Sequence, residues 1–311
     1  MAPERISILY NPSAGMGRAL RRKLELERLL RHFEVRYDLI MTRSEEHLRE
    51  LTRDHARTYR TVAGAGGDST FHIMINEIMK AGTDVNFGLI GVGSSNDIPV
   101  EFGVDSFEKA CRALKTGRTR RIDLGCVREG QAPLAYFMGQ ANIGLGAFVN
   151  MRVAELAVRR PRLARRQTLA GIMAIRNAFR SKKIPLPLRV DSEAGRTDGY
   201  FVAAIFSNIR FWATGKIINP EAVPDDGILN ACLIEPCSFL RLARLSSLAG
   251  KGRHLEAKEV RTLRAAGFEI ASEKPFEIQS DGEIMKASDG RSAFKHITLS
   301  VVPRALNLVC P

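Results

Sequence analysis

Two short loops rich in glycine and serine have the composition that phosphate binding requires. Residues 63–70 read Ala-Gly-Ala-Gly-Gly-Asp-Ser-Thr, and residues 91–97 read Gly-Val-Gly-Ser-Ser-Asn-Asp. Small residues allow backbone N–H groups to approach phosphate oxygens, and the start of a following helix adds a favourable field. Neither loop is a P-loop or a complete G-x-G-x-x-G motif. Each one alone is therefore a weak signal, because most glycine loops are turns.

Acidic residues occupy four loops of the chain. They are Asp68, Asp97, the pair at 225–226, and Asp281 with Glu283. A single Asp-Gly is usually a β-turn. Phosphoryl transfer, however, needs carboxylates that hold Mg²⁺ and one that receives the proton of the acceptor hydroxyl. Together with the two glycine loops, the set favours a phosphotransferase.

The elements that position these loops change character near residue 120. In the first part, apolar strands alternate with amphipathic helices, which predicts a parallel α/β sheet. The strands are expected at 6–10, 34–41, 61–65 and 87–92, and the helices at 18–32, 44–55, 71–79 and 106–116. Both glycine loops then lie at the carboxyl ends of parallel strands, where ligands bind in such folds.

Beyond residue 120 the pattern is mostly strands separated by turn signals. Strands are expected at 122–127, 134–143, 186–190, 200–207, 228–234, 269–270, 276–279 and 297–302, with helices only at 151–181 and 238–248. This pattern predicts an antiparallel β-sandwich. The fold class is therefore α/β plus all-β. A Rossmann-like domain spans residues 1–123, a β-rich domain spans 124–302, and the tail 303–311 is expected to pack back on the first domain.

The formal net charge of the 311-residue chain is +13, and the excess is local. Residues 151–185 contain ten basic residues and one acidic residue, and residues 241–264 contain seven and two. Such a local excess of positive charge indicates an anionic partner, which could be a nucleic acid, a phosphate-bearing ligand or an anionic membrane. Nucleic acid is the least favoured of these, because no strand platform rich in aromatic residues is visible.

Few features of the sequence indicate the cellular compartment. The five cysteines are widely spaced and form no C-x-x-C pair, which suits a reducing cytoplasm. No secretory signal is visible, and the uncharged run 130–151 contains too many polar and glycine residues for a membrane span. We therefore expect a cytoplasmic protein.

The motifs together resemble the diacylglycerol kinase catalytic family, especially its bacterial lipid kinases, which are related to sphingosine kinases. Six segments carry the resemblance in order along nearly the whole chain: 11–15 (N-P-S-A-G), 66–70 (G-G-D-S-T), 93–97 (G-S-S-N-D), 122–125 (I-D-L-G), 219–229 and 281–283 (D-G-E). The resemblance implies a fold like that of NAD kinases and diacylglycerol kinases. It also implies transfer of phosphate from ATP, with Mg²⁺, to a lipid hydroxyl.

The resemblance also assigns roles to residues. The nucleotide site would comprise Asn11, Thr42, Gly66, Gly67, Asp68, Ser69, Thr70, Ser94, Asn96 and Asp97. Glu283 would be the proton acceptor, with Asp281 as the alternative, because chemistry alone does not separate carboxylates two residues apart. A metal would bind at Asp226 with the backbone carbonyls of Val223 and Ile228. The lipid itself is not identified, and a homodimer is among the open oligomeric states.

Several residues depart from the family pattern. Ser69 replaces a glycine, which would be strained if that position needed a positive φ. His72 and Ile73 stand in place of Asn-Glu, Gly139 in place of an asparagine, and residues 213–215 in place of a glycine triplet. These departures favour one alternative, a catalytically weak relative that binds lipid or nucleotide. A second alternative is an NAD-kinase-like enzyme, because that related fold shares a G-G-D-G motif, although the D-G-E segment and the basic segment argue against it. The basic segments predict peripheral docking on an anionic membrane, where each Lys or Arg contributes about 1 kcal/mol.

Overall fold

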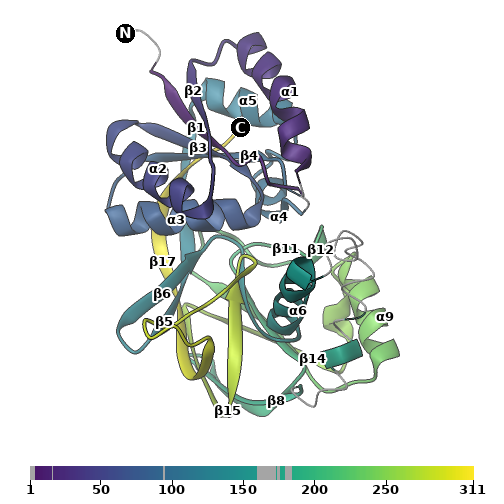
Figure 1. Ribbon diagram of the computed structural model, residues 1–311. Helices are drawn as coiled ribbons and strands as arrows, with labels where there is room; N and C mark the ends of the chain where they lie inside the picture. Colours follow the sequence, from purple (N-terminus) through teal and green to yellow (C-terminus); the bar gives the residue numbers. More distant parts are fainter. Residues whose placement is uncertain (1–3, 16, 94, 160–172, 174–175, 179–183) are drawn as a thin grey trace. The chain divides into compact units, whose positions relative to one another are not determined.

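The computed structural model describes residues 4–15, 17–93, 95–159, 173, 176–178 and 184–311, which form two compact units (Figure 1). Unit 1 holds the described residues up to Leu124, together with Ala213–Gly215 and Val302–Pro311. Unit 2 holds the described residues from Gly125 to Trp212 and from Lys216 to Val301. The sequence placed the boundaries at 123 and 302 and did not separate residues 213–215 from the second domain.

Unit 1 is a parallel sheet covered by helices on both faces, as the alternating pattern predicted. The strand order is β17-β4-β3-β1-β2, and the paired segments are parallel. The strands are β1 (Ile6–Tyr10), β2 (Tyr37–Met41), β3 (Thr61–Gly66), β4 (Asn86–Gly91) and the end of β17 (Ala293–Val309). Helices α1 (Arg18–His32) and α5 (Phe107–Thr116) lie on one face (Figure 1), and α2 (Glu45–Thr58) and α3 (Asp68–Ala81) lie on the other.

Local signals explain where these helices begin and end. The Ser44 hydroxyl accepts the N–H of His47 at the start of α2, and Ser106 caps α5 in the same way. Side-chain caps of this kind satisfy N–H groups that have no partner within the helix. Gly82 ends α3 in a left-handed conformation, which glycine adopts without steric cost.

Unit 2 is an antiparallel sandwich. One layer runs β14-β13-β10-β7-β15, and the other contains β5, β6, β8, β9 and the first half of β17. The bounds are β5 (Thr119–Glu129), β6 (Ala132–Phe137), β7 (Gln140–Gly144), β8 (Leu186–Ser192), β9 (Gly195–Phe201), β10 (Ala203–Ser207), β13 (Leu229–Ile234), β14 (Val260–Ala265), β15 (Gly267–Ser280) and β16 (Glu283–Ile284). A small hairpin joins β11 (Phe211–Trp212) to β12 (Lys216–Ile217).

Strand β15 belongs to both layers of the sandwich. Its first part pairs with β8 and β17, and its last part pairs with β7, with a register shift between Ala271 and Phe276. Bulges of this kind let one strand change layers. A fully buried core lies between the layers and includes Phe137, Phe206 and Phe268. A second cluster packs under α6 (Leu145–Arg159), α9 (Phe239–Ala249) and the short 3₁₀ helix η1 (Arg253–Glu256).

Three strand predictions were wrong. The expected strand 134–143 is two strands, β6 and β7, because the N–H groups of Met138 and Gly139 donate to the Asp281 carboxylate instead of a sheet ladder. The expected strand 200–207 is interrupted at Val202, whose carbonyl accepts the N–H of Leu145. The segments 269–270 and 276–279 are one continuous strand, β15.

Two other expectations concern the long helix before β8 and the absence of a membrane span. Most of the predicted helix 151–181, with most of the first basic segment, lies outside the described residues. None of the helices in the described part of the chain combines the length and the apolarity needed to cross a membrane.

Candidate functional site

The two glycine loops of unit 1 touch each other through their backbones. They follow the adjacent parallel strands β3 and β4, and the N–H groups of Val92 and Gly93 both donate to the Gly66 carbonyl, at 2.8 and 3.1 Å. A Cβ atom on Gly93 would lie 2.5 Å from the Cα of Gly67. Since that distance is far below van der Waals contact, glycine is required here. The sequence correctly predicted that both loops lie at the carboxyl edge of the sheet.

Asp68 joins the two loops. It is the first residue of α3, and its carboxylate accepts the N–H groups of Asp97 and Ile98 at 3.2 and 3.3 Å. These N–H groups open α4 (Asp97–Glu101), so Asp68 acts as the cap of the neighbouring loop's helix. Asn96 precedes α4 in a left-handed conformation with a φ of 58°, and its amide donates to the Gly93 carbonyl.

Asn11, Gly66 and Thr70 form a second contact at this edge. The Asn11 amide donates to the Thr70 hydroxyl at 3.0 Å, and its backbone N–H donates to the Ala65 carbonyl. A Cβ atom on Gly66 would lie 2.3 Å from the Thr70 hydroxyl oxygen, so this glycine makes room for Thr70. Thr42 lies beside them at the end of β2, where its buried hydroxyl donates to the Tyr10 carbonyl.

Ser69 and Ser94 complete the predicted nucleotide set. Ser69 is an exposed residue of the first turn of α3, and it is not among the residues with positive φ. The expected strain from replacing glycine there is therefore absent. Ser94 lies outside the described residues. His72, a further departure, is buried on α3, and its backbone carbonyl accepts the side-chain amide of Asn76.

The Asp97 carboxylate holds a segment that the sequence assigned to the other domain. It accepts the N–H groups of Thr214 and Gly215 at 3.1 and 2.7 Å, and the Ser95 hydroxyl at 2.8 Å. The φ values of Ala213, Thr214 and Gly215 are 49°, 68° and 87°. Three consecutive left-handed residues explain why a glycine triplet is usual in the family, since alanine and threonine carry a steric cost there.

In unit 2, Asp281 is buried and fully engaged by the backbone. Its carboxylate accepts three N–H groups, from Met138 at 2.8 Å, Gly139 at 3.0 Å and Gln140 at 2.8 Å. A Cβ atom on Gly139 would lie 2.7 Å from the Asp281 carboxylate, which explains the glycine at this position. Asp281 has a φ of 46°, and it shapes the turn between β15 and β16.

Glu283 is the other carboxylate of this turn, and its surroundings differ. It begins β16 opposite Ser280 and is partly exposed. Within the described chain, no hydrogen bond or ion pair engages its carboxylate. The geometry thus separates two acids that the sequence left as alternatives: Asp281 stabilises the turn, and the Glu283 carboxylate is available for chemistry.

Buried amides beside this turn escaped the sequence analysis. The pairing of β15 with β7 sets Gln279 opposite Asn142, and the Asn150 amide of α6 donates to both Gln279 and the Gly282 carbonyl. Neither polar atom of the fully buried Asn142 side chain has a partner among the described residues. Amides in strands give no distinct sequence signal, because only the register brings them together.

The predicted metal ligands lie in the loop before β13. One oxygen of Asp226 accepts the Ile228 N–H at 3.0 Å, and the other lies 3.6 Å from the Arg264 guanidinium. Val223 is exposed, and the described residues contain no cluster of three or more His, Cys, Asp or Glu side chains suited to a metal. A hard divalent cation takes six or more oxygen ligands. Because Arg264 already supplies the counter-charge, the loop fits a resident metal poorly, and no step is assigned to one.

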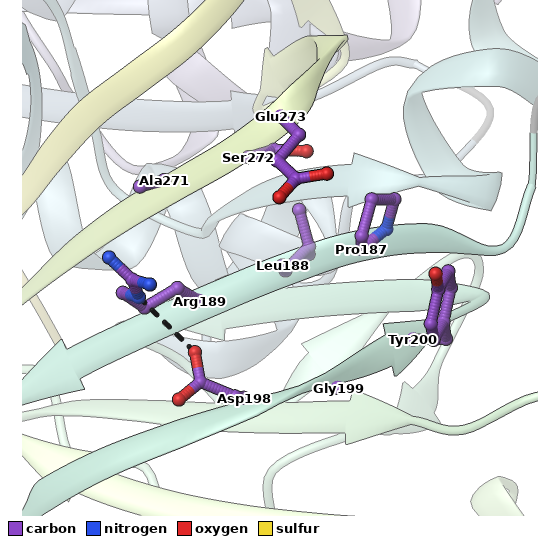
Figure 2. Close-up of a pocket in the computed structure, with 9 residues that line it drawn as sticks. All are labelled: Pro187, Leu188, Arg189, Asp198, Gly199, Tyr200, Ala271, Ser272 and Glu273. Carbon is purple, nitrogen blue, oxygen red and sulfur yellow. Dashed lines mark hydrogen bonds and ion pairs between the residues drawn. The ribbon is translucent and has the colours of Figure 1, made fainter.

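A hollow of about 360 Å³ opens on the strand surface of unit 2 (Figure 2). Residues from β8, β9 and β15 line it, including Tyr200 and Glu273, and Arg189 forms an ion pair with Asp198 across it at 3.3 Å. It contains none of the predicted site residues.

Comparisons with known proteins agree with these features. Residues 5–127 match the model of the diacylglycerol kinase catalytic domain, and residues 139–310 match that of the YegS C-terminal NAD kinase beta sandwich-like domain. A diacylglycerol kinase of Mycobacterium tuberculosis is 28% identical over 313 residues, covering 99% of this chain and 95% of the relative. A diacylglycerol kinase of Bacillus subtilis is 22% identical over 314 residues, covering 97% of each chain.

Solved structures show the same fold. The crystal structure of a diacylglycerol kinase from Bacillus anthracis superposes with a TM-score of 0.70 at 13% identity, covering 100% of this chain and 98% of that one. The fold and the two family models define a two-domain lipid kinase, and hence a transferase. The chain belongs to the diacylglycerol kinase family with the YegS-type C-terminal domain.

Proposed function

We propose that the protein transfers the γ-phosphoryl group of MgATP to the hydroxyl of diacylglycerol or a similar lipid alcohol. The acceptor oxygen forms a bond to the γ-phosphorus, and the bond from that phosphorus to the oxygen of ADP breaks. The hydroxyl proton passes to the Glu283 carboxylate. Magnesium enters with ATP as part of the substrate and neutralises charge on the phosphates.

The donor side of this proposal is supported by the glycine edge of unit 1. Gly66, Gly67 and Gly93 carry no side chain, and helix α3 begins directly after the first loop. Backbone N–H groups at such a helix start favour bound phosphate. In the proposal Asp68 and Asp97 are positioning residues, because their carboxylates engage the protein's own N–H groups.

The contrast between Asp281 and Glu283 carries the proposal for the base. The two oxygens of the Asp281 carboxylate already accept three backbone N–H groups, so this carboxylate is committed to holding the turn. Glu283 has no such bonds among the described residues and is partly exposed. General-base catalysis of this kind typically contributes 10²- to 10⁴-fold to the rate.

A partly apolar hollow in unit 2 supports a lipid acceptor. It measures about 270 Å³ and is lined by the apolar side chains of Phe148, Ile184 and Leu186 and also by Lys274 and Glu277. Phe148 lies on α6 two residues before Asn150, whose amide donates to the Gly282 carbonyl beside Glu283. We assign the apolar part of the acceptor to this hollow.

The test is transfer of label from radiolabelled ATP to a panel of lipid alcohols in mixed micelles. We expect labelled phospholipid from diacylglycerol or from a close analogue. No labelled lipid across the panel, from enzyme whose folding is verified by circular dichroism, would reject the proposal.

The competing functions are separated by two additional arms of the same assay. Labelled NADP⁺ formed from NAD would identify an NAD-kinase-like enzyme, an alternative that the name of the second family model keeps relevant. Binding of MgATP without transfer to any acceptor would identify a weak relative. The relaxed backbone at Ser69 argues against the second alternative, since the replacement of glycine there brings no strain.

A further inference from the structure

We propose that the outer face of helix α9 is the surface by which unit 2 docks on an anionic lipid bilayer. The inner face of α9 is accounted for, because Leu242, Leu245 and Ala249 are buried. The outer face exposes large apolar side chains. Leu240 is 80% exposed, the highest value among the large apolar residues of the described chain, and the adjacent Phe239 is 41% exposed. This proposal rests on the lipid-kinase function, because it names the surface on which the acceptor is met.

Charge on the second basic segment is less extensive than the sequence suggests. Four of its cations are ion-paired in the fold: Arg241 with Glu259, Arg253 with Glu256, Arg261 with Glu235, and Arg264 with Glu221 and Asp226. Three of these acids lie outside the segment counted along the sequence, so the sequence alone overstated the patch. A general attraction to any polyanion therefore loses support.

Three cations of this segment form no ion pair within the described chain, and two of them lie on the same stripe as Leu240. Arg244 and Lys251 are exposed and form no ion pair with the rest of the described chain. They follow Leu240 by four and eleven residues, and this spacing places all three on one helical face. The turn continues past the end of α9, because the Lys251 N–H donates to the Leu248 carbonyl at 3.0 Å.

This combination fits the interface of a bilayer better than it fits another protein surface. An apolar side chain beside cations on one face of a surface helix is the pattern of interfacial helices. Helix α9 contains no acidic residue at all. The helix itself thus presents cations to anionic lipid headgroups, while Leu240 enters the apolar boundary.

Helix α1 of unit 1 offers a matched surface that is also basic but contains two acidic residues. Leu20 and Leu24 are 56% and 64% exposed and one turn apart. Acidic residues share the helix, however, with Glu25 paired to Arg22 and Glu27 paired to Lys23. Arg28 and Arg31 of α1 are exposed, form no ion pair within the described chain, and follow Leu24 by four and seven residues, so α1 also carries cations beside its leucines. It differs from α9 in the two carboxylates close to Leu24, and it is the control that tests whether those carboxylates prevent docking.

The experiment is cosedimentation of the full chain with vesicles of phosphatidylglycerol and phosphatidylcholine, or of phosphatidylcholine alone. We expect binding to the anionic vesicles only, weakening as salt rises from about 0.1 M to about 0.5 M. The double variant Arg244→Gln/Lys251→Gln should lower the partition coefficient about thirtyfold, because each cation contributes about 1 kcal/mol. Leu240→Ser should lower it about tenfold.

The control variant Leu24→Ser should bind like the wild type. Equal losses for Leu24→Ser and Leu240→Ser, or no loss for Leu240→Ser, would overturn the proposal. A change of oligomeric state in Leu240→Ser, measured by light scattering, would overturn it too, because Leu240 would then contact a second copy.

Activity distinguishes failure of docking from failure of the lipid-kinase function. With an acceptor dispersed in micelles of neutral detergent, Leu240→Ser should work like the wild type. With the acceptor in anionic vesicles, it should be about tenfold slower at limiting lipid. If no lipid is phosphorylated in either form while vesicle binding still depends on Leu240, the docking surface stands and the proposed reaction fails.

Discussion

The loop edge of unit 1 and the carboxylate turn of unit 2 use the same residue type in different ways. In unit 1, Asp68 and Asp97 both accept backbone N–H groups of neighbouring loops. In unit 2, Asp281 does the same, while Glu283 two residues later keeps a carboxylate that nothing in the described chain engages. These aspartates thus bind the protein's own backbone, and Glu283, the proposed base, differs from them by making no such bonds within the described chain.

The largest expected effect is on the reaction. Glu283→Gln should lower kcat by roughly 10²- to 10⁴-fold, because the amide cannot accept the proton of the acceptor hydroxyl. The melting temperature should stay within about 1 °C of the wild type, since no described contact is lost. Radiolabel transfer and calorimetry on the same preparation measure both quantities. Unchanged kcat would remove Glu283 from the chemistry.

Asp281→Asn should act on stability instead. The amide has one oxygen for three N–H groups and no charge, so the unfolding free energy should fall by roughly 3 kcal/mol. Urea denaturation measures this fall, with Glu283→Gln as the control that removes the same charge two residues away. Equal stability of the two variants would contradict a structural role for Asp281.

Glu77 tests whether a buried carboxylate stabilises unit 1, as Asp281 is expected to stabilise the turn of unit 2. This buried glutamate of α3 pairs with Lys80, Arg49 and Arg53 at 3.0 to 3.1 Å. Burial raises its pKa, but the three cations lower it by more, so the net pKa is depressed. Its contribution to stability is therefore present above the unfolded pKa of about 4.3 and is lost as pH falls through the lower folded value.

The corresponding variant is Glu77→Gln. Removing one member of a buried ion network should cost about 3 kcal/mol at pH 7 and less at pH 3, where the wild type is itself losing the interaction. Urea denaturation at the two pH values measures the difference. Glu50→Gln on the exposed face of α2 is the control and should be neutral. A penalty that does not shrink in acid would contradict the pKa direction.

Asp97→Asn should cost about 1 to 2 kcal/mol, because it weakens the bonds to the N–H groups of Thr214 and Gly215. Hydrogen exchange at these two amides should accelerate selectively. Asp105→Asn, at an exposed position whose one ion-pair partner among the described residues is Lys109, is the control. Unaltered protection of the 213–215 amides would show that Asp97 does not hold this segment.

The smallest predicted effect is a gain in stability and not a loss. Ala213 has a φ of 49°, so Ala213→Gly should stabilise the protein by about 1 kcal/mol. The control Ala243→Gly, at an exposed position inside α9, should destabilise it by a similar amount. Thermal denaturation compares them, and a loss of stability in both would show that residue 213 carries no strain.

Local patterns in the sequence were sufficient for the parallel unit and its glycine edge. Ile6–Tyr10 and Arg18–His32 have the predicted bounds, because a buried run and a 3.6-residue period are local signals. The break between β6 and β7 could not be predicted, since its cause, Asp281, is more than 140 residues away. The same limit applies to the ion pairs that neutralise residues 241–264 and to Asp97 holding Ala213–Gly215.

The candidate site was predictable as a set of residues but not as a division of roles. The motifs named Asp281 and Glu283 together, and only the three N–H groups of residues 138–140 distinguish them. Metal binding at Asp226 remains a prediction that the Arg264 contact weakens.

The central claim, that Asp281 holds the turn while Glu283 takes the proton, is tested most directly by turnover per folded molecule. Asp281→Asn and Glu283→Gln would be assayed together at a temperature where both are folded by circular dichroism. Turnover of Asp281→Asn should stay within about tenfold of the wild type, and that of Glu283→Gln should fall by at least about a hundredfold. A folded Asp281→Asn that loses as much turnover as Glu283→Gln would contradict the account.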